Sequence, residues 1–177
     1  MGKLVAGVVV GAVTLLGMAA LNEHAPLALA GPKVLREDPS ALARHDIPHR
    51  YRTLYRSAAA HRCHTLPWSV LAGIGKVESD HGRSHARGVH AGANRAGARG
   101  PMQFLPGTFA RYAVDGDHDG RATPYDPSDA IPTAARMLCA EGARPGTLPA
   151  IKEALYAYNH AHWYVDKTLN WAQRYTR

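Results

Sequence analysis

Glu78 is the residue whose setting in the sequence most favours acid chemistry. It lies in a stretch from Pro67 to Ser84, and Pro67 suits the first turn of a helix, where its missing N–H is not needed. Leu71, Ile74 and Glu78 then fall at positions i, i+3 and i+7, so the carboxyl group shares a helix face with aliphatic side chains. A carboxyl group in apolar surroundings has a raised pKa and can donate a proton near neutral pH. The alternative is a Glu at a frayed helix end that faces water.

A second stretch, Asp115 to Asp126, has the twelve-residue spacing of an EF-hand calcium loop. The residues at its ligand positions are Asp115, Asp117, Asp119, Arg121 through its carbonyl, Thr123 and Asp126. Oxygen ligands of this kind suit Ca²⁺ better than a soft metal, so we expect a structural calcium ion and no organic cofactor. Asp126 is shorter than the usual closing Glu, which lowers the expected affinity, and it also caps a predicted helix. The alternative is a solvated acidic turn without an ion.

A third cluster follows the turn at Gly100 and Pro101, where Met102, Gln103 and Phe104 stand side by side. Gln offers a hydrogen-bond donor and an acceptor, while Met and Phe offer apolar faces. A sugar ring has the same mixture of hydroxyl edges and a C–H face, so the cluster favours a glycan-binding role. An ordinary turn that leads two core residues into a helix remains the alternative.

Other chemistries find less support. His81, His85 and His90 lie in a loop without the His-Glu-x-x-His pattern of a zinc site, so we expect solvated surface histidines. The sequence has no Gly-x-Ser-x-Gly elbow for a serine nucleophile. The arginines are scattered, with no basic ribbon interleaved with aromatic residues, which argues against nucleic acid as a partner.

The segments that must position these groups are predicted to be helices. Periodicity and capping residues predict helices over 46–63, 67–78, 106–112, 126–139, 148–158 and 163–175, with Pro132 expected to kink or shorten the fourth. Residues 31–45 read as a flexible linker, and 81–99 as a mobile surface loop. No strand-like alternation persists, so we expect a mainly α fold of about five to seven helices around one core.

The first thirty residues have the pattern of a secretory signal. Lys3 precedes an apolar run from Leu4 to Leu21, and a small-residue cleavage motif ends at Ala30. An uncleaved membrane anchor is the alternative, since the run is about long enough to span a bilayer. Either reading places the remainder outside the cytoplasm, as a secreted, cell-wall or membrane-anchored protein that contacts a membrane only through an uncleaved segment.

Two cysteines, Cys63 and Cys139, remain in the exported part. An even count in an oxidising compartment predicts one disulfide, with a pair of buried thiols as the alternative. The net charge of +7 stays with the exported part, because Lys3 and Glu23 cancel in the first thirty residues. A basic exported protein is drawn to anionic surfaces such as cell-wall polymers.

The motifs together resemble those of a known family. Glu78-Ser79, Gly100-Pro101-Met102-Gln103-Phe104, the Asp-rich loop and Ala157-Tyr158-Asn159 occur in the order seen in lytic transglycosylases of the lysozyme-like superfamily, and most resemble the membrane-bound type B branch. The resemblance covers about Ile47 to Tyr175. It implies a lysozyme-like catalytic domain over 46–177 and a calcium loop.

The resemblance also implies the site and the reaction. Glu78 is the expected catalytic acid, and the residues expected to bind substrate are Ser79, Met102, Gln103, Phe104, Tyr158 and Asn159. The expected reaction cleaves the β-1,4 bond between N-acetylmuramic acid and N-acetylglucosamine in peptidoglycan and leaves a 1,6-anhydro product. We expect a monomer that acts on glycan strands. A lysozyme-like hydrolase and a non-catalytic wall-binding module are the alternatives.

Overall fold

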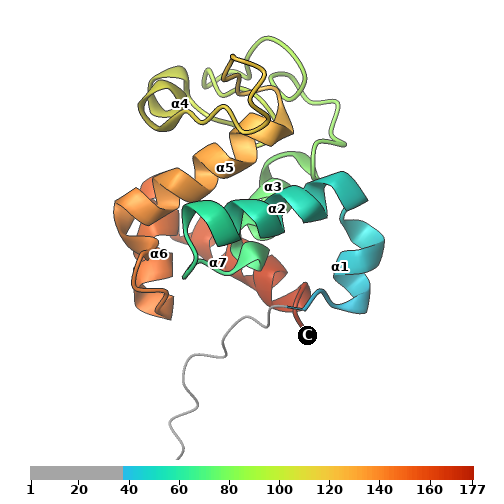
Figure 1. The fold of residues 1–177 in the computed structure, drawn as a ribbon, viewed down its shortest axis with the longest axis vertical. Coiled ribbons are helices and arrows are strands. Elements are labelled where there is room, and N and C mark those ends of the chain that lie inside the picture. The colour runs from blue at the N-terminus through green and yellow to red at the C-terminus, as the bar shows by residue number, and fades with distance from the viewer. Residues whose placement is uncertain (1–37) are drawn as a thin grey trace, which may run out of the picture. The chain divides into compact units, whose positions relative to one another are not determined.

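The computed structural model describes residues 38–177, and the expected signal segment and most of the expected linker lie outside them. The described part contains seven α-helices and no β-strand (Figure 1). Their bounds are α1 Ala41–Asp46, α2 His49–Arg62, α3 Trp68–Ser79, α4 Pro106–Tyr112, α5 Pro127–Leu138, α6 Leu148–Tyr158 and α7 His162–Arg174, with a π-helical turn η1 at Cys139–Ala143. The mainly α expectation is therefore confirmed.

The predicted helix positions agree well with α3 to α7, and two predictions need correction. Residues 41–46 form helix α1 rather than a flexible arm: Ser40 caps it, and Ala43 is buried. The second helix begins at His49 instead of residue 46, because Ile47 adopts an extended backbone between α1 and α2. Pro132 lies inside α5 without ending it.

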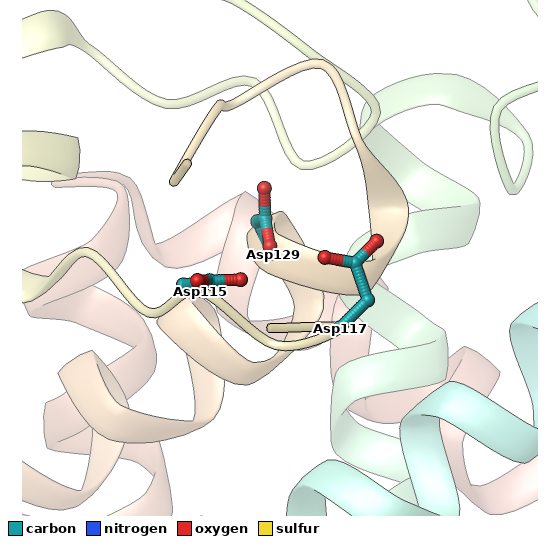
Figure 2. Close-up of side chains that lie close together, drawn as sticks. All are labelled: Asp115, Asp117 and Asp129. Atoms are coloured by element: carbon teal, nitrogen blue, oxygen red, sulfur yellow. The ribbon is translucent and has the colours of Figure 1, made fainter. Parts of the chain in front are cut away.

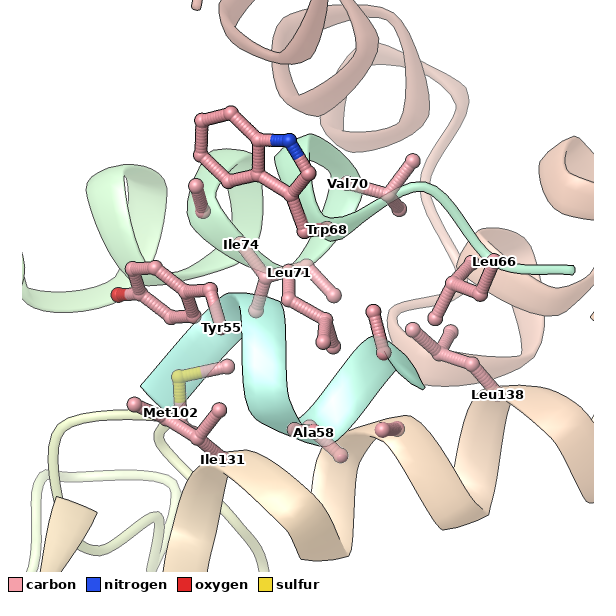
Figure 3. Packing of buried hydrophobic residues seen from close by; sticks show 14 of the residues in the cluster. Tyr55, Ala58, Leu66, Trp68, Val70, Leu71, Ile74, Met102, Ile131 and Leu138 are labelled. Carbon is pink, nitrogen blue, oxygen red and sulfur yellow. The ribbon is translucent and has the colours of Figure 1, made fainter. Parts of the chain in front are cut away.

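Helix α3 is the centre of the hydrophobic core. Its residues Val70, Leu71 and Ile74 are fully buried, and Figure 3 shows them packed beside α2, with α5 on the far side of that helix. Gly73 lets α7 come close, since a Cβ there would lie 2.5 Å from the carbonyl oxygen of Thr168. Protein interiors are close-packed, so the position of α3, and with it that of Glu78, is tightly defined by its neighbours.

His81 is buried, which corrects the expectation of a solvated histidine. Its Nδ1 lies 3.0 Å from the Tyr55 hydroxyl and its Nε2 lies 2.9 Å from the Tyr175 hydroxyl, which donates to Asp46 at 2.6 Å. Because Tyr175 gives its proton to Asp46, it accepts from Nε2–H, and Nδ1 accepts from Tyr55. Lys76 also pairs with Asp46, at 2.9 Å. Neutral His81 thus joins α2 to the C-terminal end of the chain.

His81 should make the fold sensitive to acid. Burial lowers its pKa to about 3 from the usual 6.5, so its contribution to stability is complete above pH 6.5 and is lost as the pH falls towards 3. His81→Gln keeps a donor and an acceptor but does not titrate. We expect its melting temperature to fall less steeply than that of the wild type between pH 6.5 and 4, as measured by thermal unfolding. Parallel profiles would contradict this role.

The predicted disulfide is confirmed. Cys63 follows α2 and Cys139 follows α5, and the two are bonded with their Cα atoms 5.6 Å apart. The bond closes a loop with a sequence separation of 76 residues that contains α3, α4, the acidic loop and α5. Within residues 38–177, no helix is both long and apolar enough to cross a membrane.

Candidate active site

Glu78 lies one residue before the end of α3 and is half-buried. The helix ends there because Asp80 adopts a left-handed conformation (φ 53°) and the N–H of His81 bonds to the Gly75 carbonyl. Burial raises the pKa of Glu78 to about 7, against the opposing effects of the Tyr164 hydroxyl and the Lys167 charge. A substantial fraction of Glu78 is therefore protonated at neutral pH, as a general acid requires.

Tyr164 is a site residue that the sequence analysis missed. It lies in the first turn of α7 with an exposed fraction of only 1%. Its hydroxyl is near enough to the Glu78 carboxylate to lower the pKa of that group, yet it forms no hydrogen bond of good geometry within the described residues. A buried hydroxyl without a hydrogen bond lowers the stability of the folded protein unless it finds a partner. Its position six residues after Tyr158, across a short turn, is the signal that could have identified it.

Tyr158 and Asn159 lie at the end of α6. The Tyr158 ring stacks on that of Tyr164 at 6.3 Å, and burial, together with the charge of Glu78, raises the Tyr158 pKa. Its hydroxyl donates to the Met102 carbonyl at 2.7 Å, so it braces the Gly100–Phe104 turn instead of holding the carboxylate. Asn159 is half-buried, and its side chain makes no hydrogen bond to the rest of the described chain.

Three expected substrate-binding side chains are buried. Met102 and Phe104 have exposed fractions of 0% and 2%, and Ser79 has 2%. Ser79 donates to the Pro101 carbonyl at 2.6 Å and accepts from Gly82 at 2.8 Å. In this conformation none of the three can touch a ligand with its side chain. The expectation is corrected to a supporting role, because their bonding and packing tie the Gly100–Phe104 turn to the end of α3.

Gln103 stays within reach of the surface. It is half-buried and has a left-handed backbone (φ 49°), whereas Met102 and Phe104 on either side of it are buried. Its Oε1 accepts from Asn94 at 2.9 Å, and its Nε2 donates to the Gly100 carbonyl at 2.7 Å. One amide hydrogen remains for a ligand.

Asp80 does not supply a second catalytic carboxylate. It accepts from Lys76 at 2.6 Å and from Arg83 at 2.7 Å, and these bonds lower its pKa. The side chain is thus held in the ion-pair cluster around Asp46. Glycosidases of the usual kind use two carboxylates flanking the bond that breaks. The C-terminal end of α3 therefore supplies no second catalytic carboxylate beside Glu78.

The acidic loop brings together a set of carboxylates that differs from the predicted one. Oxygens of Asp115, Asp117 and Asp129 lie within 4.8 Å of one another, and Figure 2 shows the three side chains grouped together. Asp126 is instead the cap of α5, accepting from Ser128 at 2.7 Å, and it pairs with Arg50 at 3.2 Å. The last carboxylate of the group therefore comes from Asp129 in the first turn of α5. The twelve-residue spacing predicts Asp126, three residues earlier.

Asp129 has the properties of a cation ligand. It is 2% exposed, and its two oxygens accept from the N–H groups of Gly116 and Thr123, both at 2.9 Å. Burial, followed by the nearby charges of Asp117 and Asp126, raises its pKa despite these bonds. A cation would relieve the repulsion among carboxylates so close together, and hard oxygen donors suit Ca²⁺. The residues present therefore fit a calcium ion.

Comparisons with known proteins show that this chain is similar to transglycosylases. Residues 81–162 match the Transglycosylase SLT domain. The match includes Gln103, the acidic loop and Tyr158, and it begins three residues after Glu78. Over 56 residues the chain is 41% identical to membrane-bound lytic murein transglycosylase B of Escherichia coli, a match that covers 32% of this chain and 16% of that protein.

Solved structures extend the likeness to most of the fold. The Escherichia coli lytic transglycosylase Slt35 in complex with bulgecin A matches with a TM-score of 0.57 and 16% identity, over 74% of this chain and 75% of that one. Slt35 in complex with calcium matches with a TM-score of 0.57 and 15% identity, over 74% and 76%. These structures confirm the lysozyme-like fold, and the domain and sequence matches above bear out the resemblance to lytic transglycosylases.

Proposed function

We propose that this chain is a peptidoglycan lytic transglycosylase in which Glu78 is the single acid and base. The observation that carries the proposal is a half-buried carboxyl group with a pKa of about 7, beside the buried Tyr164 hydroxyl and with Asp80 held elsewhere. The SLT domain and the similarity to transglycosylase B support the reaction class. The expected signal segment and the disulfide both suit an exported enzyme that works on the cell wall.

The proposed reaction needs only one carboxyl group because the substrate supplies the nucleophile. Glu78 donates its proton to the glycosidic oxygen, and the bond from that oxygen to C1 of N-acetylmuramic acid breaks. The N-acetyl group stabilises the positive charge at C1. The Glu78 carboxylate then takes the proton of the C6 hydroxyl, whose oxygen bonds to C1 and closes the 1,6-anhydro ring. Glu78 ends protonated, and no water is consumed.

Around Glu78, other residues position the substrate and the acid. We propose that the free amide hydrogen of Gln103 and the side chain of Asn159 bind sugar hydroxyl or N-acetyl groups. Tyr158 and Ser79 hold the Gly100–Phe104 turn against α3, since their hydroxyls donate to the carbonyls of Met102 and Pro101. Tyr164 is a positioning residue for Glu78, and its hydroxyl gains a full partner when the carboxylate ionises during the reaction.

Digestion of purified peptidoglycan, with mass spectrometry of the soluble products, tests the proposed function. A transglycosylase releases fragments that end in 1,6-anhydro-N-acetylmuramic acid. Reducing N-acetylmuramic acid ends without the anhydro form would show a hydrolase and contradict the single-acid mechanism. Binding of the wild-type protein to peptidoglycan without release of fragments would indicate a wall-binding module.

Calcium binding to Asp115, Asp117 and Asp129 is a second part of the proposal, supported by the calcium complex of Slt35. A ligand at a concentration of about 100 times its Kd stabilises a protein by about 2.7 kcal/mol. We therefore expect added Ca²⁺ to raise the melting temperature of the wild type and of Asp126→Asn, which keeps a helix cap. In Asp129→Asn the increase should be lost. Equal melting temperatures for the wild type with Ca²⁺ and with a chelator would contradict the site.

A further inference from the structure

Trp163 is an exposed aromatic residue next to Tyr164 on α7. It is the second residue of α7, and 63% of its surface is exposed, whereas Trp68 is 5% exposed. Single exposed aromatic residues are common, so exposure alone indicates nothing. The position is more informative: the Trp163 ring stands edge-on to that of Tyr164, with centroids 5.9 Å apart, and the Tyr164 hydroxyl is the group that faces Glu78.

Lys167 lies one helical turn after Trp163. Residues four apart share a helix face, so Lys167 and Trp163 are neighbours on α7. Lys167 is exposed and near enough to Glu78 for its charge to act on that carboxylate. It forms no ion pair with any acid of the described chain. An exposed aromatic ring and a cation without an ion-pair partner in the described chain therefore lie one turn apart on α7, the helix whose Tyr164 and Lys167 act on Glu78.

We propose that Trp163 and Lys167 form a substrate subsite in which the indole stacks on a sugar ring and the ammonium group pairs with a carboxylate of the attached stem peptide. The inference rests on the proposed function and names the part of the substrate that α7 recognises. A Trp ring offers a large apolar face that matches the C–H face of a pyranose. A Lys ammonium is a point charge that suits a flexible, exposed carboxylate.

The two residues should respond to different parts of the substrate. Binding is measured by calorimetry in the Glu78→Gln background, which removes turnover, with two probes: a peptide-free N-acetylglucosamine oligosaccharide and a glycan strand that carries stem peptides. Truncation of a central aromatic contact commonly weakens binding by at least roughly tenfold. We expect this loss for Trp163→Ala with both probes, and partial recovery with Trp163→Phe. Lys167→Gln should weaken only the peptide-bearing strand, and raising the salt concentration should reduce that difference.

Tyr156→Ala is the matched control. Tyr156 is also an exposed aromatic residue, and it lines a groove of about 520 Å³ along α7 whose lining includes neither Glu78 nor Trp163. Affinities equal to those of the parent for Trp163→Ala, with unchanged melting temperatures, would overturn the subsite, and so would a loss found only for Tyr156→Ala. Failure of the proposed function looks different: the wild type releases no fragments from peptidoglycan, whatever α7 binds.

Discussion

Glu78→Gln is expected to remove peptidoglycan cleavage while making the protein more stable at alkaline pH. Gln has the shape of protonated Glu but cannot donate a proton, and loss of a general acid lowers rates by about 10² to 10⁴-fold. With one group serving as both acid and base, we expect the upper end of this range. Fragment release from peptidoglycan measures the activity.

The stability effect follows from the direction of the pKa shift. The Glu78 pKa is raised in the folded protein from 4.5 to about 7, so its contribution to stability is complete below pH 4.5 and is lost as the pH rises through 7. Gln does not ionise, so the variant keeps at alkaline pH the stability that the wild type loses when Glu78 ionises. The difference of about 2.5 pKa units corresponds to about 3 kcal/mol in the unfolding free energy above pH 8 and to none at pH 4. An active variant, or one less stable than the wild type at pH 8, would contradict the assignment.

Removal of the disulfide is expected to have the largest effect on stability. The bond between Cys63 and Cys139 has a sequence separation of 76 residues, and the chain-entropy relation gives about 4 kcal/mol for a loop of this length. Cys63→Ser together with Cys139→Ser should lower the unfolding free energy by that amount in urea titration. The control is the wild type under reducing conditions, which should show the same loss. A difference below about 1 kcal/mol would mean that the bond constrains the unfolded chain little.

The sequence indicated the helices because their ends carry local signals. Pro106 and Pro127 occupy the first turns of α4 and α5, and Asp126 caps α5, so each signal lies at the start of the helix that it marks. Glu78 was found in the same way, from its spacing relative to Leu71 and Ile74. Such features depend on neighbours in the chain and not on how the helices pack.

The remaining site features depend on contacts between distant segments. His81 is buried because Tyr55 and Tyr175 surround it, and neither lies near it in the sequence. Asp129 joins the carboxylates because the acidic loop folds back onto α5, with Gly116 so close that a Cβ would lie 1.9 Å from the Ser128 carbonyl. Periodicity and spacing contain no information about these approaches.

The pKa of Glu78 is the measurement that tests the central claim most directly. The wild-type protein and Glu78→Gln are labelled with ¹³C at the Glu side-chain carboxyl carbon, and the resonance missing from the variant identifies Glu78. Its chemical shift is followed from pH 4 to pH 9. A midpoint near 7 is the predicted result, because burial disfavours the charged form. A midpoint near 4.5 would place a charged carboxylate at the site at neutral pH and contradict the proposed acid.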